Sequence, residues 1–550
     1  MMEVEKQIIP NIREIFNKEE YEECLKVINN HMKSNKTLEN SLNLIVIKAQ
    51  ALAEMDRLPE AIQVLKNCTD DRVGDLRTKY ENHLKLESSI NPKLPECSKY
   101  IKFEEWIKTN EGKFSKLKII LYAPDYRGVH AISTIKQNDP FLKIPEKLII
   151  TSKKGQMCPL GKKIKESGVK LSYDYLTFLS VFLLEAANDP KSWWAPYIKM
   201  IPTNVSNFPL FYTKEEINMF EGSIMEEYIK STQSEFDEEY NLICKHVPEM
   251  KKYSLESYMK IKTLVISRIF FVKIDNVDER IIVPYADMFN HHYEKIGQSF
   301  WKYDSQSKEF VVTAQKQIPR GESICENYGQ KPNFRFLFYY GFVIEENILN
   351  AVYIDIFLEE KDPLLEIKRK MIGVSNLKIQ RCTFFNDFSQ NDNNLFFSLM
   401  RFICYKGEPT FLLEHLDPQP VDIINIKSTK RKVNLEHYSI ENEILMHQKI
   451  ILIVEQNLSK YKTTIEEDLQ ILKTNLNFNQ RNTRVLLKCD KQLYEMMREM
   501  SHKSIELLNL NYDKACKEFE KLKTKDFKSY IEKAVLGLLK DKKISVPPAN

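Results

Sequence analysis

Residues 283–292 read VPYADMFNHH and residues 321–333 read GESICENYGQKPN, and these two stretches decide how the middle of the chain folds. The first runs from a β-branched residue into Asp287, Asn290 and His291, whose side chains favour sharp turns through hydrogen bonds to the backbone. The second stretch is followed by the aromatic run FYYGF at 338–342, which suggests a slot walled by rings. Taken singly, each stretch also fits a plain structural role, as a turn capped by histidine or as ordinary core.

Short β-type runs surround these two stretches, and helical periodicity lies between them. Turn residues separate the runs, which are at 118–122, 141–144, 148–151, 280–283 and 309–313. From residue 173 to about 272 the apolar spacing predicts helices, one of them over 255–271. Beyond about residue 346 the pattern predicts mostly long helices.

The sequence of the first 90 residues predicts a helical unit with a weak internal repeat. The stretch that begins at Tyr21 is repeated 37 residues later (58 − 21) from Leu58, with the small residues Cys24 and Ala61 at matching places. This pattern resembles a pair of tetratricopeptide-like helical hairpins, and a plain helical bundle is the alternative. Because two repeats alone are marginal, we expect the unit to pack on the next segment of the chain, and it is also a candidate surface for a protein partner. Prolines at 92 and 95 mark its end.

Composition excludes several classes of function. The 81 basic and 77 acidic residues give a net charge of +4, which argues against a dedicated nucleic-acid binder. No apolar run reaches the ~18 residues of a membrane span. The ten cysteines contain no C-x₂₋₄-C pair, so no zinc site is expected, and reduced thiols of an intracellular protein are expected instead. We expect a cytoplasmic protein, to which the basic cluster at 427–432 adds nuclear import unless it is only a surface loop.

The motifs are more specific when they are read together and in order. The patterns R-G-V-x-A, S-R-x-F, A-D-M-x-N-H and Y-G-x-K-x-N…Y-G-F are similar to those of the SET-domain branch typified by the Rubisco large-subunit methyltransferases. They stand at 127–131, 267–270, 286–291 and 328–342. The helical tail is similar too, since TTIEED at 463–468 resembles the start of a late helix pair in that branch. Thr463 with Glu466, or Thr464 with Glu467, predicts a capping box there.

The resemblance covers roughly residues 95–545 and implies an α+β fold. Small β-sheets form a SET catalytic domain over 95–345, with a helical insert at about 152–268. An all-helical, substrate-binding-like domain follows over 346–545, and the helical-repeat unit of residues 1–90 precedes the SET domain. The implied activity is methylation of another protein, with S-adenosylmethionine as the cofactor and no metal.

The resemblance also implies which residues form the site. The expected cofactor-binding residues are Asp139, Phe141, Arg268, Asp287, Asn290, His291 and Tyr328. Asn290 and His291 would act largely through backbone groups, and Arg268 would face the cofactor carboxylate as a charge-assisted donor. The expected substrate-binding residues are Phe270, Ala286, Asp287 and Tyr340. Tyr328 is the expected central catalytic residue and Tyr340 the wall of the acceptor channel, with Tyr339 as the alternative to Tyr340.

The expected acceptor is a lysine. Only about one free lysine in two thousand is neutral at pH 7, and an apolar, aromatic channel lowers the pKa of the amine. A related sub-branch methylates a histidine of actin and carries Asn and Trp at the positions of Phe270 and Ala286, so this histidine activity is one alternative. An inactive SET scaffold that binds partners through its helices is another. Two departures from the family pattern are Asp139, one methylene shorter than the usual Glu, and Pro332, where Ser is usual.

Overall fold

The computed structural model describes residues 2–545, except 56, 69, 89–94, 124–125, 293–298, 389, 411–438 and 525. It consists of two compact units, one formed by Met1–Val205 with Phe236–Gly329 and the other by Ser206–Glu235 with Gln330–Asn550. The boundaries of the predicted domains, at 1–90, 95–345 and 346–545, differ from those of the two units. The three domains therefore stay predictions. The basic cluster at 427–432 and Pro92 lie outside the described residues.

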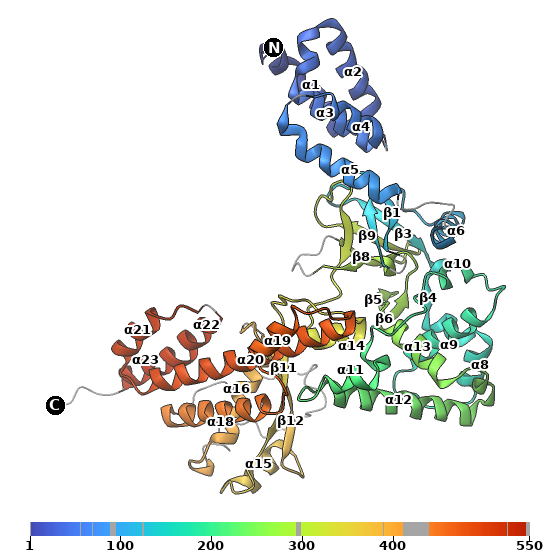
Figure 1. Ribbon diagram of the computed structural model, residues 1–550. Helices are drawn as coiled ribbons and strands as arrows, with labels where there is room; N and C mark the ends of the chain where they lie inside the picture. Colours follow the sequence, from blue (N-terminus) through green and yellow to red (C-terminus); the bar gives the residue numbers. More distant parts are fainter. Residues whose placement is uncertain are drawn as a thin grey trace. The chain divides into compact units, whose positions relative to one another are not determined.

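The N-terminal part of the first unit is helical, drawn in blue in Figure 1. Its helices are α1 (Met2–Asn17), α2 (Tyr21–Ser34), α3 (Leu42–Glu54), α4 (Leu58–Lys66) and α5 (Gly74–Ser88). The two halves of the sequence repeat fall on α2 and α4, and Cys24 and Ala61 are both fully buried in one shared core. Glu54 accepts hydrogen bonds from the backbone nitrogen of Thr134 at 2.6 Å and from its hydroxyl at 2.5 Å. These bonds fasten the helices to the part of the unit that lies beyond α6 (Pro95–Thr109).

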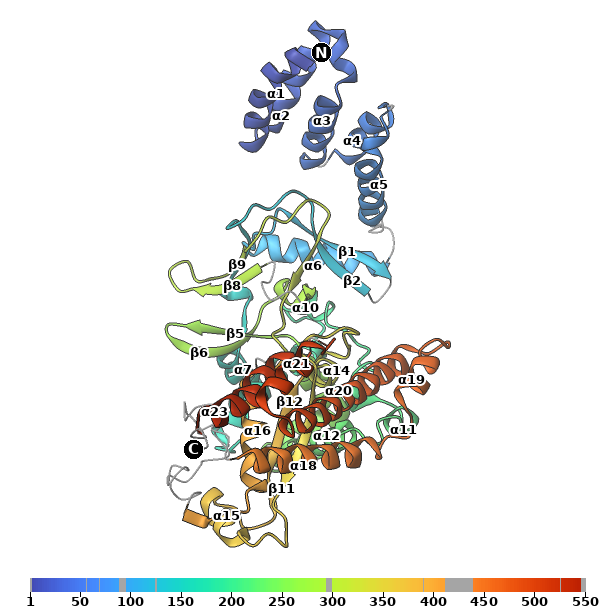
Figure 2. The ribbon, with the colours of Figure 1, turned by 90° about the vertical axis from the view of Figure 1, so that its left-hand side faces the viewer.

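Three small sheets form the β part of the first unit, as the predicted α+β fold requires (Figure 2). The four-stranded sheet has the order β1 (Leu117–Ala123), β2 (Tyr126–Ala131), β10 (Ser323–Glu326), β7 (Asn290–His291). The second sheet has the order β3 (Pro140–Pro145), β9 (Glu309–Ala314), β8 (Ser299–Asp304). The third has the order β4 (Ile150–Thr151), β6 (Val277–Ile282), β5 (Ile269–Ile274).

Strand β10 brings three distant segments together. It pairs antiparallel with β2, where Ser323 lies opposite His130, and parallel with β7, where Cys325 lies opposite Asn290. On its other side β2 approaches β1 closely, because a Cβ on Gly128 would lie 2.2 Å from the hydroxyl of Tyr122 on β1. The sheet therefore places both deciding stretches beside the R-G-V motif.

Helices fill most of the span where the sequence predicts an insert. They are α7 (Ser152–Met157), α8 (Pro159–Glu166), α9 (Asp174–Asn188), α10 (Ala195–Ile198), α11 (Lys214–Asn218), α12 (Met225–His246) and α13 (Leu255–Ile266). Within the first unit, the half-buried carboxylate of Glu239 binds Thr177, Tyr258 and Lys262, which joins α12 to α9 and α13.

The predicted helix over 255–271 is too long, because α13 ends at Ile266 and strand β5 begins at Ile269. The run IFFV is apolar throughout, and a short apolar run fits a buried helix or a strand equally well. In the structure its side chains alternate, with Phe270 and Val272 buried and Phe271 exposed.

The described residues of the second unit are mainly helical, and they include a two-stranded sheet. Its elements from residue 330 onward are α14 (Asn333–Tyr340), β11 (Ala351–Phe357), α15 (Leu365–Ile372), β12 (Lys378–Phe385), α16 (Asn391–Cys404), α18 (Ile440–Leu458), α19 (Ile465–Ile471), α20 (Phe478–Leu508), α21 (Tyr512–Glu520), α22 (Lys528–Tyr530) and α23 (Gly537–Ser545). The antiparallel β11–β12 pair was not predicted. Thr464 and Glu467 form the capping box of α19, which confirms the second of the two predicted pairs.

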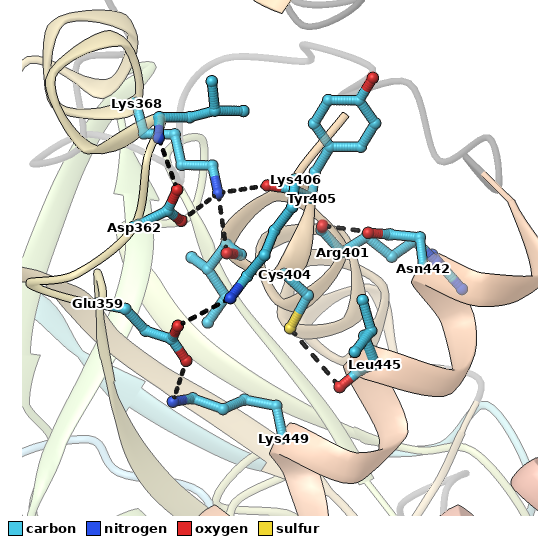
Figure 3. A network of polar contacts seen from close by, with 12 residues as sticks. Glu359, Asp362, Lys368, Arg401, Cys404, Tyr405, Lys406, Asn442, Leu445 and Lys449 are labelled. Carbon is cyan, nitrogen blue, oxygen red and sulfur yellow. Dashed lines mark hydrogen bonds and ion pairs between the residues drawn. The ribbon is translucent and has the colours of Figure 1, made fainter. Parts of the chain in front are cut away.

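A buried lysine connects α15 to the end of α16 (Figure 3). Lys368 is fully buried, and its Nζ donates to Asp362 Oδ2 at 2.6 Å and to the carbonyl oxygens of Ile403 at 2.9 Å and Tyr405 at 2.7 Å. These three bonds use all the donors of the ammonium group. Burial lowers the pKa of Lys368, and the bond to Asp362 offsets this only in part, while the network fixes the helix ends around it.

Candidate active site

The first deciding stretch contains a strained residue. Tyr285 has φ 80° and ψ −51°, a backbone conformation that non-glycine residues rarely adopt. Its side chain is fully buried, its ring lies 4.4 Å from that of Phe114, and its hydroxyl donates to Glu104 Oε1 at 3.1 Å. Strain of this kind persists only where the surroundings hold it. This anchorage turns the chain directly before Ala286–His291.

The side chains of Asn290 and His291 bind the protein itself. Asn290 Nδ2 donates to the carbonyl oxygen of Arg127 at 3.0 Å. His291 Nδ1 accepts from the backbone nitrogen of Tyr328 at 3.1 Å, so that nitrogen is unprotonated. Because both side chains are engaged in this way, the predicted contribution of Asn290 and His291 to cofactor binding would come from their backbone groups.

Tyr328 lies directly against the same turn. Its hydroxyl donates to the carbonyl oxygen of Phe289 at 2.6 Å, and its ring centroid is 5.2 Å from that of His291. Phe141, another predicted site residue, packs on Phe289 with ring centroids 6.3 Å apart. The structure therefore brings together Phe141, Asn290, His291 and Tyr328, from segments nearly 190 residues apart (328 − 141).

A buried ion pair lies in the same stretch. Arg268 Nη1 donates to Asp287 Oδ2 at 2.9 Å, and the two side chains are 10% and 0% exposed. Burial is the largest single influence on the pKa of Arg268 and lowers it, but Asp287, Tyr197 and Tyr328 together raise the pKa above its ordinary value. Tyr197 also donates to Asp287 Oδ2, at 2.8 Å, and burial raises the pKa of this tyrosine well above its ordinary value.

Three buried polar atoms near this pair have no hydrogen-bond partner among the described residues. They are Arg268 Nε, Asp287 Oδ1 and Glu326 Oε1. Burial, and then the charge of Asp287, raises the pKa of Glu326 well above its ordinary range. An unsatisfied buried polar atom costs ~1–3 kcal/mol, so such atoms call for an explanation. A polar ligand that bears both a carboxylate and an ammonium group would satisfy the Arg268 and Asp287 atoms.

The other predicted site residues have varied surroundings. Asp139 forms an ion pair with Lys116, Nζ to Oδ2 2.6 Å, and its side chain is 28% exposed. Phe270 is buried in strand β5, with its ring 5.2 Å from that of Phe310. Ala286 is fully buried.

The predicted channel wall, Tyr340, belongs to the second unit. It lies at the end of α14, where its ring is 6.1 Å from that of Phe336 and 5.7 Å from Nζ of Lys331. The choice between Tyr340 and Tyr339 stays a prediction, as do the roles of all the site residues, the partner of the N-terminal helices and the compartment.

Sequence reasoning missed three members of the buried cluster. Arg127 points Nη1 at the carbonyl oxygen of Met288, 3.5 Å away, and burial lowers its pKa. Tyr197 and Glu326 are the other two. Arg127 and Glu326 stand inside motifs that the sequence singled out, so the available signal for these two was a charged side chain within a motif.

Three further features concern the part of the chain that the structure describes. No group of three or more His, Cys, Asp or Glu side chains there is arranged to hold a metal ion. No described helix has the length and apolar character needed to cross a membrane. None of the ten cysteines forms a disulfide bond in the structure.

Comparison with known proteins gives matches in both units. Residues 126–329 match the family model described as SET domain, and residues 359–493 match the model described as Rubisco LSMT substrate-binding. The actin-histidine N-methyltransferase of Xenopus tropicalis is 23% identical over 407 residues, which cover 71% of this chain and 68% of that protein. Its counterpart from Papio anubis is 23% identical over 384 residues, 67% of this chain and 62% of that protein. The chain thus spans about two thirds of the length of these relatives.

Solved structures show the same fold. The SET domain of LSMT bound to lysine and AdoHcy superposes with a TM-score of 0.61 at 18% identity, covering 80% of this chain and 98% of that one.

Proposed function

We propose that this chain, which matches the SET domain and Rubisco LSMT substrate-binding models, methylates the side-chain amine of a lysine in another protein. The cofactor is S-adenosylmethionine, whose sulfonium group supplies an activated methyl when bound. The observation that carries the proposal is the attachment of Tyr328 to the 289–291 turn, beside a buried ion pair with unsatisfied polar atoms.

The residues present fit this cofactor. Its amino-acid part carries a carboxylate, for which Arg268 Nε is a free charge-assisted donor, and an ammonium group, for which Asp287 Oδ1 is a free acceptor. The backbone groups of Asn290 and His291 would hold the remainder, since their side chains are already bound within the protein.

In the proposed reaction the protein acts mainly by positioning. Tyr328 would orient the acceptor amine, and the carbonyl oxygens of Ala286 and Asp287 would accept hydrogen bonds from it. Holding the amine in line with the methyl group lowers the activation free energy, because the translational and rotational entropy is already lost when the substrate binds. The apolar surroundings of Phe270 and Ala286 disfavour the ammonium form, so the reactive neutral amine is reached at lower pH.

The residues at two positions favour lysine over histidine. An imidazole presents one nitrogen for methylation only when the other is held by a hydrogen bond, because that bond fixes the tautomer. Phe270 has no polar atom for such a bond, whereas the actin-histidine sub-branch carries Asn at this position. Ala286 has a smaller side chain than Trp, which suits the long alkyl chain of a lysine better than an imidazole.

Methyl labelling of a cell extract tests the proposal. The purified chain is incubated with the extract and methyl-labelled S-adenosylmethionine, and the modified residue is located by mass spectrometry. We expect label on lysine nitrogen. Label on histidine would replace lysine by the actin-type activity, and calorimetry that detects no cofactor binding would leave only the partner-binding scaffold.

A further inference from the structure

The second unit contains a large groove that the proposed reaction does not use. Its volume is about 1430 Å³, above the ~300–1,000 Å³ of small-molecule pockets, so a polypeptide segment fits it better than a metabolite does. Strand β11 and helices α18 and α20 contribute to its lining, together with the residues around the start of α12.

One carboxyl group in this groove is buried and incompletely bonded. Asp490, on α20, lines the groove but is only 7% exposed, and its Oδ1 has no hydrogen-bond partner among the described residues. Burial raises the pKa of Asp490 well above its ordinary range, and the neighbouring Asn350 and Lys491 offset this only in part. Such a group is stabilised by any cation that reaches it.

Two tyrosines line the groove with Asp490. The rings of Tyr461 and Tyr494 have centroids 6.4 Å apart and planes inclined at 59°. Asp490 and Tyr494 lie four residues apart on α20, which puts them on the same face of the helix, and both line the groove with Tyr461. An acidic group beside tyrosine rings provides charge pairing and cation–π contact for a Lys or Arg side chain.

The other acidic groups of the groove are largely neutralised within the protein. Arg381 binds both Asp355, Nε to Oδ1 at 2.8 Å, and Glu227, Nη2 to Oε2 at 2.9 Å. Lys449 binds Glu359 at 2.7 Å, as Figure 3 shows. Asp490 is therefore a buried acid of the groove that takes no part in these ion pairs.

We propose that Asp490, Tyr461 and Tyr494 form an anchor pocket for a lysine or arginine side chain of the protein substrate, other than the side chain that is methylated. The proposal rests on the proposed function, because it takes the occupant to be the substrate. The pocket would recognise a basic residue in an extended segment, and so would add specificity to the choice of protein.

Saturation-transfer NMR on the full chain tests the pocket without cofactor or methyl transfer, so that its failure and the failure of the proposed function can be told apart. The probes are short glycine–serine peptides with one central lysine, arginine, citrulline or norleucine. We expect the lysine and arginine peptides to receive saturation along the side chain, and the citrulline and norleucine peptides to receive little.

The variant Asp490→Asn keeps the volume of the side chain and removes its charge, and it should weaken binding of the basic peptides by roughly 10- to 100-fold. Glu360→Gln is the matched control, since it removes one exposed acid from the same groove and should leave binding within twofold. If Asp490→Asn proves unfolded by circular dichroism, Tyr461→Leu replaces it. Equal binding of lysine and norleucine peptides, no binding of any peptide, or equal loss in both acid variants would overturn the proposal.

Discussion

Replacing Tyr328 by Phe removes a single hydroxyl group and keeps the ring that packs on His291. In the folded protein that hydroxyl donates to the carbonyl oxygen of Phe289 at 2.6 Å. The variant therefore tests two contributions of the hydroxyl oxygen. One is to folding stability, through the bond to the turn, and the other is to the rate of methyl transfer, through the predicted contact with the acceptor amine.

The two contributions differ in size. The net loss from one such hydrogen bond is about 1 kcal/mol of folding stability. If the hydroxyl also orients the amine, misalignment of the reacting groups costs on the order of 10²-fold in rate, or about 2.7 kcal/mol of activation free energy. A purely structural tyrosine would lose stability but would keep most of its rate.

Tyr240 supplies the matched control, because its hydroxyl donates to the carbonyl oxygen of Tyr253, also at 2.6 Å, among the inserted helices. The measurements are thermal unfolding and single-turnover methyl transfer to the protein found by labelling. We expect Tyr328→Phe and Tyr240→Phe to lower the melting temperature to a similar extent, and only Tyr328→Phe to slow the transfer. A Tyr328→Phe rate within threefold of the parent, or equal slowing in both variants, would refute the reasoning.

Three further outcomes are expected. Asp287→Ala leaves the guanidinium of Arg268 buried without its counter-ion and should lower the free energy of unfolding by ~3–5 kcal/mol, measured by urea titration; a loss below about 1 kcal/mol contradicts the buried pair. Glu326 has a pKa that is raised on folding, so the folded state loses stability as pH rises above the ordinary glutamate value; Glu326→Gln should therefore melt above the parent at pH 8, with the difference shrinking toward pH 4.5, and a difference that does not change with pH would count against it. A lysine acceptor should make kcat/KM rise by up to tenfold per pH unit between pH 6.5 and 8, whereas a histidine acceptor should level off above about pH 7.5.

The local sequence predicted the elements whose signals are local. The strands at 118–122 and 309–313 are bounded by turn residues, and β1 and β9 lie there. The capping box at Thr464 was predicted from two residues three positions apart, because the bonds concerned join only those residues. The fold class followed from the order of motifs.

The elements and contacts that escaped prediction depend on tertiary neighbours. Strand β5 could not be told from a continuation of α13, since only its pairing with β6 imposes alternation on IFFV. Likewise, no local pattern states that Tyr197 will donate to Asp287, 90 residues away, or that Glu326 will be buried beside the same carboxylate. The buried polar contacts of the candidate site were therefore the least predictable part of it.

The left-handed backbone at Tyr285 restricts which mutations the site can accept. Glycine would release ~1–3 kcal/mol of strain, but it would also empty the space beside Phe114 and leave Glu104 without its phenol, at a cost of ~3–5 kcal/mol for the lost aromatic ring alone. Any other side chain keeps the strain and loses at least one of those contacts. A single substitution at position 285 is therefore destabilising. Related proteins could replace Tyr285 only if residues 104 and 114 change as well, so these three positions should covary.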